Sequence, residues 1–530
     1  MNTVRLANLK SIRDSGAIEL KPITILVGKN SSGKSSFLRL FSLLRQSVEV
    51  RTTSPFLWYG QYVDFGSFKE ALRHDATPHQ IIFEFSFTLT NELLNEVSPP
   101  KYSMHRHLIK RLADLKGSNI RIELTLVCPQ DRAYISNITL VVGNDTIILS
   151  FDHQGKVTKF YVNNLDITEF KEEFTIGYMG KTIPGITTRK NQEQDDNVKQ
   201  RDYYYYVYGG VNKAIQAALI STTYNLFRGN TTEDNRIYVV RQIGIEPLPK
   251  FVDNLLSIPA GSVFQQNARR NADSNLMDKI RNLAIASIVP GLLLSADEEL
   301  SRVARNVRSI APVRATVERY YRKQDLGIDE VDYKGQNLAM YLSGLSIEAM
   351  KSFQEWTMNN LKFDVSVKDS EGHVEVFLEE AKGSNKYNLA DSGFGYSQIL
   401  PIVAQLWSML NPPFKSSLQR SATNIFTIEQ PELHLHPSLQ AKVADLLIAS
   451  IEGAKEKNIE LRLVVETHSE AIINRIGNQI AKGRLANQDV NIVLFEKKGP
   501  NESTEVSVAE YDKEGYLINW PYGFFEAEED

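Results

Sequence analysis

Cysteine is almost absent from this sequence, since Cys128 is the only one in 530 residues. A single thiol excludes an internal disulfide framework and is typical of proteins kept in a reducing compartment. The sequence also has no run of about 18 apolar residues, the length of a membrane-spanning helix. Its first residues have no apolar core of the kind a signal peptide needs. We therefore expect a cytoplasmic protein that has no membrane contact.

An excess of positive charge is missing as well. The 60 Lys and Arg residues are outnumbered by 64 Asp and Glu, which gives a net charge of −4. This balance excludes a protein coated with positive charge, although it leaves room for a local basic groove. Hydrophobic residues make up 42% of the chain, enough to bury a substantial core.

Strand and helix patterns change along the chain. An apolar, β-branched run at 23–27 predicts a buried strand, and apolar residues at helical spacing over 35–45 predict a helix. Residues 81–161 alternate like antiparallel strands, 210–360 favour helices, and 390–496 alternate strands with helices. We predict an α/β head with a mixed parallel and antiparallel sheet, assembled from N- and C-terminal lobes around a long, largely helical α+β insertion. The predicted regions are 1–75, 76–180, 181–362 and 363–530.

A phosphate-binding loop stands between the first predicted strand and helix. Residues 28–35 read GKNSSGKS, a full match to G-x-x-x-x-G-K-[ST]. Glycines in such a loop let backbone N–H groups cradle phosphates, the lysine reaches the β- and γ-phosphates, and the serine hydroxyl ligates Mg²⁺. We predict ATP and Mg²⁺ binding by Gly28, Lys29, Asn30, Ser31, Ser32, Gly33, Lys34, Ser35 and Ser36.

An acidic motif follows a second apolar strand near residue 425. The segment reads NIFTIEQPELHLHP, with Glu429 at the end of the strand, and we expect Glu429 to hold Mg²⁺. This motif resembles that of AAA_15/AAA_21-type ATPases, the OLD and RecF relatives of the ABC-type and SMC ATPases. The resemblance implies that Gln430 stands where a catalytic glutamate is usual. Glutamine is a poor base, so Glu432 could substitute, and hydrolysis could be slow, gated by a partner or absent. His434 and His436 leave open a metal pair or, as we favour, a structural role.

Two further segments follow the order of an ABC-type ATPase. LADSGFGYSQILPI resembles a degenerate signature motif, whose candidate contacts are Ser392, Gly393, Gly395 and Ser397. THS at 467–469 resembles a switch motif, in which His468 would sense the γ-phosphate. Gln61 could be the residue that senses Mg²⁺. The resemblance implies a head-to-head dimer, or a higher oligomer, in which Lys34 of one copy and the signature of the other share each ATP.

The resemblance extends to the ATPase subunits of antiphage defence systems of the Septu, retron-associated Septu and PARIS types. OLD nucleases carry a TOPRIM nuclease domain after the ATPase, but only about 60 residues follow His468 here. The end of the chain, INWPYGFFEAEED, resembles a DUF3696 tail. We therefore expect a sensor or scaffold that controls a separate effector, an HNH or TOPRIM nuclease encoded nearby. A RecF-like, DNA-binding repair clamp is the alternative.

A basic stretch offers a possible surface for DNA or RNA. It contains Arg302, Arg305, Arg308, Arg314, Arg319, Arg322 and Lys323, and the first three would share one helix face. The alternative is a solvated helix whose charges pair with nearby acids. A polar, tyrosine-rich stretch at 187–208 favours a mobile loop, His105 and His107 a solvated helix, and the acidic residues 526–530 a solvated tail that could also dock a basic partner.

Overall fold

The computed structural model describes residues 1–50, 52–90, 93, 106–169, 175–177, 183, 185–187, 214–312, 314, 317–324, 327–380, 385–412, 423–497, 499, 502–521 and 524. The stretch 188–208, His105, the side chain of His107 and the acidic end 526–530 lie outside the described residues. The chain divides into two compact units. The first contains residues 1–5, 47–57 and 77–301, and the second contains 6–46, 58–76 and 302–530.

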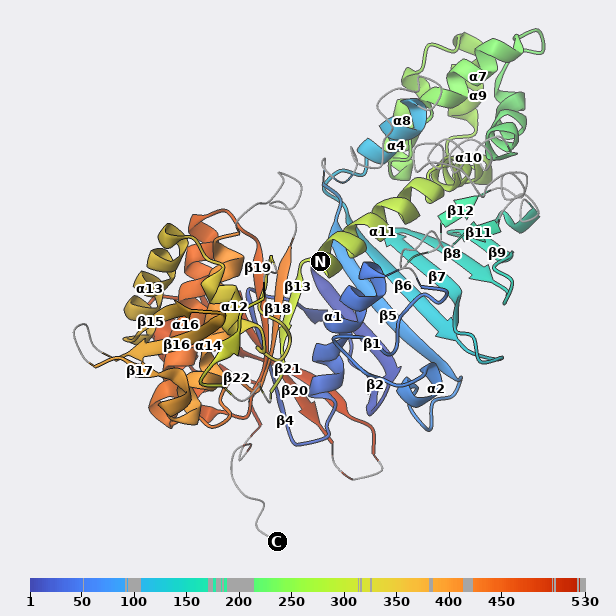
Figure 1. The fold of residues 1–530 in the computed structure, drawn as a ribbon. Helices are drawn as coiled ribbons and strands as arrows, with labels where there is room; N and C mark the ends of the chain where they lie inside the picture. Colours follow the sequence, from blue (N-terminus) through green and yellow to red (C-terminus); the bar gives the residue numbers. More distant parts are fainter. Residues whose placement is uncertain are drawn as a thin grey trace. The chain divides into compact units, whose positions relative to one another are not determined.

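A seven-stranded sheet forms the centre of the second unit (Figure 1). Its order is β13 (Val307–Ile310), β18 (Asn424–Glu429), β19 (Leu461–Glu466), β4 (Ile23–Gly28), β20 (Val490–Glu496), β21 (Glu505–Tyr511) and β22 (Leu517–Ile518). The first five strands run parallel, and the last two are antiparallel. Strand β4, from the start of the chain, lies between two strands from its end. The expected α/β class, with a mixed sheet built from both ends of the chain, is confirmed.

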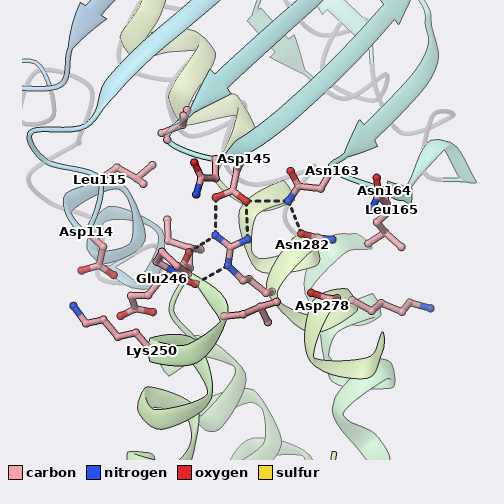
Figure 2. Close-up of a pocket in the computed structure, with 18 of the residues that line it drawn as sticks. Asp114, Leu115, Asp145, Asn163, Asn164, Leu165, Glu246, Lys250, Asp278 and Asn282 are labelled. Carbon is pink, nitrogen blue, oxygen red and sulfur yellow. Dashed lines mark hydrogen bonds and ion pairs between the residues drawn. The ribbon is translucent and has the colours of Figure 1, made fainter. Parts of the chain in front are cut away.

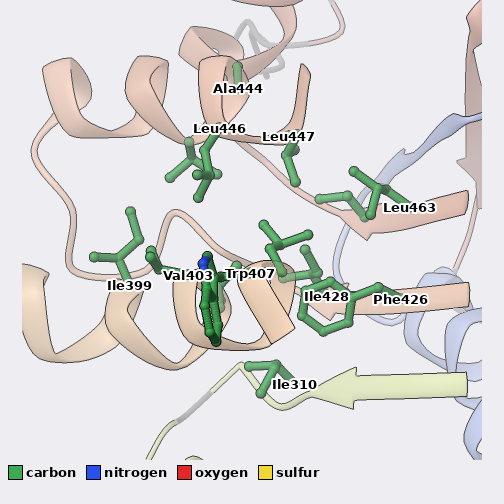
Figure 3. Packing of buried hydrophobic residues seen from close by; sticks show 14 of the residues in the cluster. Ile310, Ile399, Val403, Trp407, Phe426, Ile428, Ala444, Leu446, Leu447 and Leu463 are labelled. Atoms are coloured by element: carbon green, nitrogen blue, oxygen red, sulfur yellow. The ribbon is translucent and has the colours of Figure 1, made fainter. Parts of the chain in front are cut away.

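Both faces of this sheet are covered, which is why β4 and β18 are buried at every position. A hydrophobic cluster includes Phe426, Ile428 and Leu463 from the strands and, from the helices, Val403 and Leu447 (Figure 3). The helices that contribute to it are α12 (Leu338–Ser343), α13 (Ile347–Leu361), α14 (Phe394–Leu410), α16 (Pro437–Glu456) and α17 (Glu470–Ala481).

Helix α1 (Lys34–Glu49) packs against strand residues outside that cluster. The rings of Phe37 on α1 and Phe495 on β20 lie 5.9 Å apart. The shorter elements of the second unit are β2 (Ile12–Asp14), β3 (Ile18–Glu19), α2 (Phe68–Ala71), β14 (Tyr321–Arg322), β15 (Asp364–Ser370), β16 (His373–Glu379), β17 (Tyr387–Asn388), η4 (Leu389–Asp391) and η5 (Asn487–Asp489). Strand β1 (Thr3–Leu9) begins in the first unit and pairs with β2 in the second.

The first unit contains an antiparallel sheet and a set of helices. Strands β5 (Gln80–Thr88), β6 (Asn119–Val127), β7 (Tyr134–Val142), β8 (Asp145–Phe151), β9 (Val157–Val162) and β10 (Leu165–Asp166) follow one another as neighbours, as the alternating pattern over 81–161 predicts. Strands β11 (Thr175–Gly177) and β12 (Gly185–Thr187) pair separately. The helices are α4 (Arg106–Ala113), η3 (Tyr224–Leu226), α7 (Glu233–Gln242), α8 (Leu248–Ser257), α9 (Ser262–Arg270), α10 (Asn275–Ala286) and α11 (Val289–Arg305). Among the described residues, no helix is both long and apolar enough to span a bilayer.

Residues 302–362, which the sequence suggests belong to the insertion, lie in the second unit. The reason is β13, a strand of four residues that pairs with β18 in the central sheet. Such a short strand directly after the long helix α11 leaves little alternation to identify it in the sequence.

Candidate functional site

The predicted phosphate loop joins β4 to α1, in the strand–loop–helix arrangement that the motif requires. Gly28 has a φ of 151°, and a Cβ there would lie 2.2 Å from the backbone oxygen of Phe495. Gly33 has a φ of 103°, and its Cβ would lie 2.6 Å from Ile12. Ser31 adopts a φ of 61°. Glycine is therefore needed at positions 28 and 33, for backbone conformation and for space.

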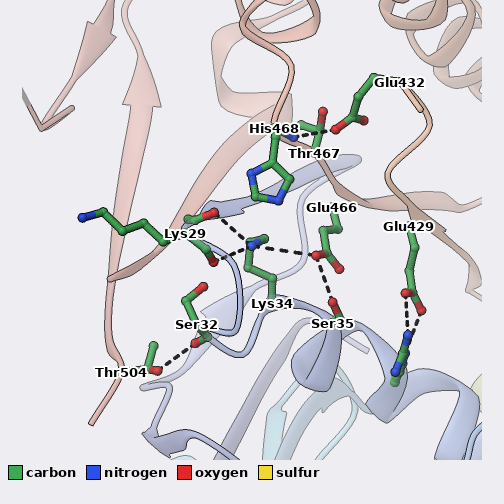
Figure 4. A network of polar contacts seen from close by, with 12 residues as sticks. Lys29, Ser32, Lys34, Ser35, Glu429, Glu432, Glu466, Thr467, His468 and Thr504 are labelled. Atoms are coloured by element: carbon green, nitrogen blue, oxygen red, sulfur yellow. Dashed lines mark hydrogen bonds and ion pairs between the residues drawn. The ribbon is translucent and has the colours of Figure 1, made fainter. Parts of the chain in front are cut away.

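Lys34 is folded back onto this loop (Figure 4). Its Nζ donates to the carbonyl oxygens of Gly28, at 2.9 Å, and Lys29, at 2.8 Å. Burial lowers the pKa of Lys34, while the nearby charges of Glu466 and Glu432 oppose that shift. The ammonium group is thus held at the start of α1 by two carbonyl oxygens, and phosphate oxygens could replace these as its hydrogen-bond acceptors.

The serine that follows Lys34 meets a carboxylate that the sequence interpretation missed. Ser35 Oγ donates to Glu466 Oε1 at 2.9 Å, and Lys34 Nζ lies 3.9 Å from the same oxygen. Burial raises the pKa of Glu466, and the hydrogen bond from Ser35 opposes this. The signal was present in the sequence, because Glu466 ends an apolar strand as Glu429 does.

Glu429, the predicted Mg²⁺ ligand, lies beside Glu466 in the sheet register but has other partners. Arg39 donates to both of its carboxylate oxygens at 2.9 Å, and the hydroxyl of Tyr333 donates to Oε1 at 3.2 Å. The pair raises the pKa of Arg39, while burial and Glu429 raise that of Tyr333. Glu429 therefore already has three hydrogen bonds, and no hydrogen bond joins it to Ser35.

Glu432 meets the switch segment. Its Oε1 accepts a 2.7 Å hydrogen bond from the backbone N–H of His468. Burial raises the pKa of Glu432. The pKa of His468 is lowered, because its ring is partly desolvated and repelled by Lys34, so the imidazole is neutral at neutral pH. The structure thus brings together Lys34, Ser35, Glu432, Glu466 and His468 around one end of the loop (Figure 4).

The remaining residues of the acidic motif have structural roles in the turn that follows β18. Gln430 has a φ of 44°, and its N–H donates to the carbonyl of Glu466 at 2.8 Å. His434 has a φ of 62°, and His436 caps α16 by accepting from the N–H of Ser438. Within the described residues, no group of three or more His, Cys, Asp or Glu side chains forms a metal cluster.

The loop and its acids fit a nucleotide with a divalent cation. Glu432 and Glu466 each keep one buried carboxylate oxygen, Oε2, that has no hydrogen-bond partner. Buried polar atoms are nearly always paired, so these oxygens indicate that something else completes the site. Carboxylate oxygens next to a serine hydroxyl are suitable for Mg²⁺, and a lysine at a glycine-rich helix start suits phosphate.

The signature candidates lie where η4 leads into α14. Gly393 is the N-cap of α14, is exposed and has open space where a Cβ would be. Ser392 is partly exposed, and its hydroxyl donates to the carbonyl of Leu389. Gly395 packs against Leu435, 3.4 Å from where its Cβ would be. Ser397 is buried, so it does not face solvent as Gly393 does.

Gln61 is not part of the cluster around the loop. It is exposed, and no hydrogen bond or ion pair joins it to the described residues of the loop.

The basic stretch is dispersed over different elements. Helix α11 ends at Arg305 and Arg308 lies in β13, so the prediction that Arg302, Arg305 and Arg308 share one helix face is wrong. A turn between the two elements changes the periodicity. Ion pairs join Arg308 to Glu330, Arg319 to Asp391 and Lys323 to Asp369. Arg302 is partly buried, Arg305 and Arg322 are exposed, and Arg314 is buried.

A separate polar pocket of about 870 Å³ lies in the first unit (Figure 2). One of its lining residues is Arg281, whose guanidinium binds both carboxylate oxygens of Asp145 at 2.6 Å. The same group donates to the carbonyls of Ile245 and Glu246. Arg281 therefore has protein partners on every nitrogen, which indicates a structural role for this ion pair.

Comparison with solved structures finds distant likenesses. An Smc head bound to the C-winged helix domain of ScpA has 11% identity and a TM-score of 0.36, over 97% of this chain and 98% of that one. An Smc head with an extended coiled coil, derived from Pyrococcus furiosus and bound to the C-terminal domain of ScpA, has 10% identity and a TM-score of 0.35, over 96% of each chain. The α/β class of this chain rests on its own strand order and not on these likenesses.

Among curated proteins, Endonuclease GajA of Bacillus cereus (strain HuB5-5) is 34% identical over 85 residues. The match covers 16% of this chain and spans 12% of the length of that relative.

The family comparison covers most of the sequence. Residues 1–473 match AAA_15, which is described as an AAA ATPase domain. The resemblance that the phosphate loop and the acidic motif indicated is thereby confirmed at the level of the family. The chain belongs to the AAA_15 family of AAA ATPase domains.

Proposed function

We propose that this chain binds ATP with Mg²⁺ at the phosphate loop and hydrolyses it slowly, as the sensor or scaffold subunit of an antiphage defence complex that controls a separate nuclease. The observation that carries the ATPase part is the convergence of Lys34, Ser35, Glu466 and Glu432 at the end of the loop. Lys34 would leave the two loop carbonyls for the β- and γ-phosphates. Ser35 and Glu466 would hold Mg²⁺, which neutralises phosphate charge when bound.

Slow turnover follows from the groups available as a base. Gln430 cannot accept a proton from an attacking water, whereas Glu432 has one free, buried carboxylate oxygen. Burial raises the pKa of Glu432, which makes its carboxylate form a stronger proton acceptor but leaves a smaller fraction of the group in that form. His468 lies next to Glu432 through its backbone N–H and presents a neutral ring to the same region.

The first test is ATP binding and turnover by the purified chain. We expect Lys34→Ala to reduce ATP affinity by about 100-fold, because a charge-assisted contact to phosphate is lost. Lys482→Ala, which removes an exposed lysine from the end of α17, is the matched control and should bind normally. A chain that fails to bind ATP, or binds it equally after Lys34→Ala, would contradict the proposed site.

The dimer belongs to this proposal too. Exposed Gly393 and partly exposed Ser392 stand at the N-terminus of α14, and a helix N-terminus favours an anion such as the γ-phosphate held by a second copy. We expect Ser392→Arg and Lys34→Ala each to abolish turnover alone. Mixing the two variants should restore part of it, because one intact composite site then forms. If the mixture turns over no more ATP than the two variants measured separately, the copies do not share a site.

The defence role draws on the resemblance of the motifs and on the 34% identity over 85 residues with a protein named an endonuclease. We expect Lys34→Ala in the native locus to abolish protection against phage while leaving expression unchanged. DNA cleavage by the purified chain alone, with Mg²⁺ and no second protein, would contradict a separate effector. If cells with Lys34→Ala remain protected against phage but survive DNA damage poorly, the result would support the repair clamp instead.

A further inference from the structure

Arg314 is the buried cation that the site described so far leaves unused. It follows β13, the strand next to β18, and its side chain is 3% exposed. Parallel strands bring their carboxyl ends to the same edge of a sheet, so Arg314 lies at the edge where the acidic motif begins. Its Nη2 donates to the backbone carbonyl of Glu429 at 3.2 Å. Its Nε and Nη1 are buried and have no hydrogen-bond partner.

Two other buried arginines show how unusual this is. Arg111 is as deeply buried, but its nitrogens donate to the carbonyls of Ile243 and Val240 and to Ser287. Arg281 is held by Asp145 and two carbonyls. Leaving a buried cation unpaired is costly, and proteins keep such groups where a ligand completes them. Arg314 therefore lacks an anion.

The surrounding charges indicate which anion this is. Burial lowers the pKa of both Lys34 and Arg314, and the charge of Glu432 opposes that shift for each, so Glu432 interacts electrostatically with both cations. Even with its pKa lowered to about 10 by burial, Arg314 is charged at neutral pH. Among the described residues, neither Glu432 nor Glu429 forms an ion pair with it. Its unpartnered N–H groups suit the oxygens of a phosphate group, which arginine binds through charge-assisted hydrogen bonds.

We propose that Arg314 is a catalytic residue that donates from its guanidinium to the terminal phosphate of ATP. This rests on the proposed function, since it requires ATP at the phosphate loop. In phosphoryl transfer, negative charge is spread over the oxygens of the transferred group, and a fixed guanidinium stabilises it. The same chain would supply this cation in addition to Lys34.

The test compares ATP with ADP, because only ATP carries the terminal phosphate. Arg314→Met keeps much of the side-chain volume without the charge, and Arg314→Lys keeps the charge without the planar guanidinium donors. We expect both to leave Mg–ADP affinity within about 3-fold of the unmodified chain. We expect Arg314→Met to weaken Mg–ATP affinity by about 10-fold and to slow turnover by about 100-fold or more, with Arg314→Lys between. Arg484→Met, which removes a surface arginine paired with Glu452, is the matched control and should change neither.

The outcomes separate this inference from the proposed function. Equal losses of ATP and ADP affinity, or no loss of either, would overturn the contact with the terminal phosphate. Slower turnover at unchanged ATP affinity, with the acid limb of the pH profile moved upward, would show that Arg314 only positions Glu432, and would also overturn it. If the unmodified chain binds no ATP, the proposed function itself fails. The unfolding midpoint without nucleotide checks the fold, and if Arg314→Met does not fold, Arg314→Lys decides by the same ATP and ADP comparison.

Discussion

Three glutamates lie near the phosphate loop, and each has a different environment. Glu429 is neutralised by the guanidinium of Arg39, Glu466 is bound by the hydroxyl of Ser35, and Glu432 accepts from the backbone of His468. The carboxylate that is already paired with an arginine has the least capacity left for a cation. Glu466, which touches the loop serine, has the better position for Mg²⁺.

This division predicts different effects for two conservative substitutions. Glu466→Gln should weaken Mg²⁺-dependent ATP binding by about 10-fold or more, because a negative ligand is lost next to Ser35. Glu429→Gln should mainly reduce the free energy of unfolding, by about 1–3 kcal/mol, because Arg39 loses its carboxylate partner. This cost is smaller than for a fully buried ion pair, because the Arg39 side chain is 38% exposed and water screens its charge. Calorimetric titration with and without Mg²⁺, together with urea unfolding, measures both. If Glu429→Gln abolishes the Mg²⁺ effect and Glu466→Gln does not, the assignment is reversed.

The protonation of Glu432 predicts the pH dependence of turnover. Only the carboxylate form can accept a proton from water, and burial raises its pKa. Turnover should therefore be full above this raised pKa and fall as the pH drops through it, at a pH higher than an exposed glutamate would give. The measurement is kcat against pH at saturating MgATP. Glu432→Gln should leave a low residual rate without this acid limb, and an unchanged limb in that variant would assign it to another group.

At the scale of elements, the loop depends on how closely β4 and β20 approach. Gly28 stands at the end of β4, opposite Phe495 of β20 in the register. The backbone oxygen of Phe495 occupies the space where a side chain at residue 28 would begin. The glycine of the phosphate motif is thus required by the packing of the sheet as well as by the nucleotide.

Two alanine substitutions separate these contributions. Gly483 has a φ of 72° with open space around it, so Gly483→Ala should cost only about 1 kcal/mol of unfolding free energy, from backbone strain. Gly28→Ala should cost about 3 kcal/mol or more, because a Cβ 2.2 Å from a backbone oxygen forces the strands apart. Urea unfolding of the two variants without nucleotide gives the comparison. Equal costs would mean that the loop relaxes around the added methyl group.

At the scale of the whole molecule, every residue assigned to the candidate ATP site lies in the second unit, although the site draws on both ends of the chain. The four tryptophans, Trp58, Trp356, Trp407 and Trp520, also lie in that unit. Tryptophan fluorescence therefore reports the unfolding of the unit that would bind the nucleotide.

We expect MgATP to raise the unfolding midpoint seen by tryptophan fluorescence. A ligand at 100 times its dissociation constant stabilises the folded state by about 2.7 kcal/mol. Far-ultraviolet circular dichroism, to which both units contribute, should show a second transition that moves less if the two units unfold separately. Lys34→Ala should remove the shift. Equal shifts of both signals would show that the two units unfold as one.

The sequence by itself determined the local parts of this protein. The order of strand, glycine loop and helix at Gly28 to Ser35 needs only neighbouring residues, and the alternating strands of 81–161 are set by side-chain periodicity. Acidic residues at the ends of apolar strands were visible in the same way, and so was the assembly of one α/β core from both ends.

Only the tertiary structure decided which of these groups meet. Ser35 and Glu466 are 431 positions apart, and their hydrogen bond depends on β19 lying next to β4. Arg314 reads in the sequence as one of seven cations on a basic surface, yet the pairing of β13 with β18 buries it beside the acidic motif. Charge spacing along a chain shows which residues are near in sequence, whereas burial and ion pairing depend on contacts between strands that the spacing does not contain.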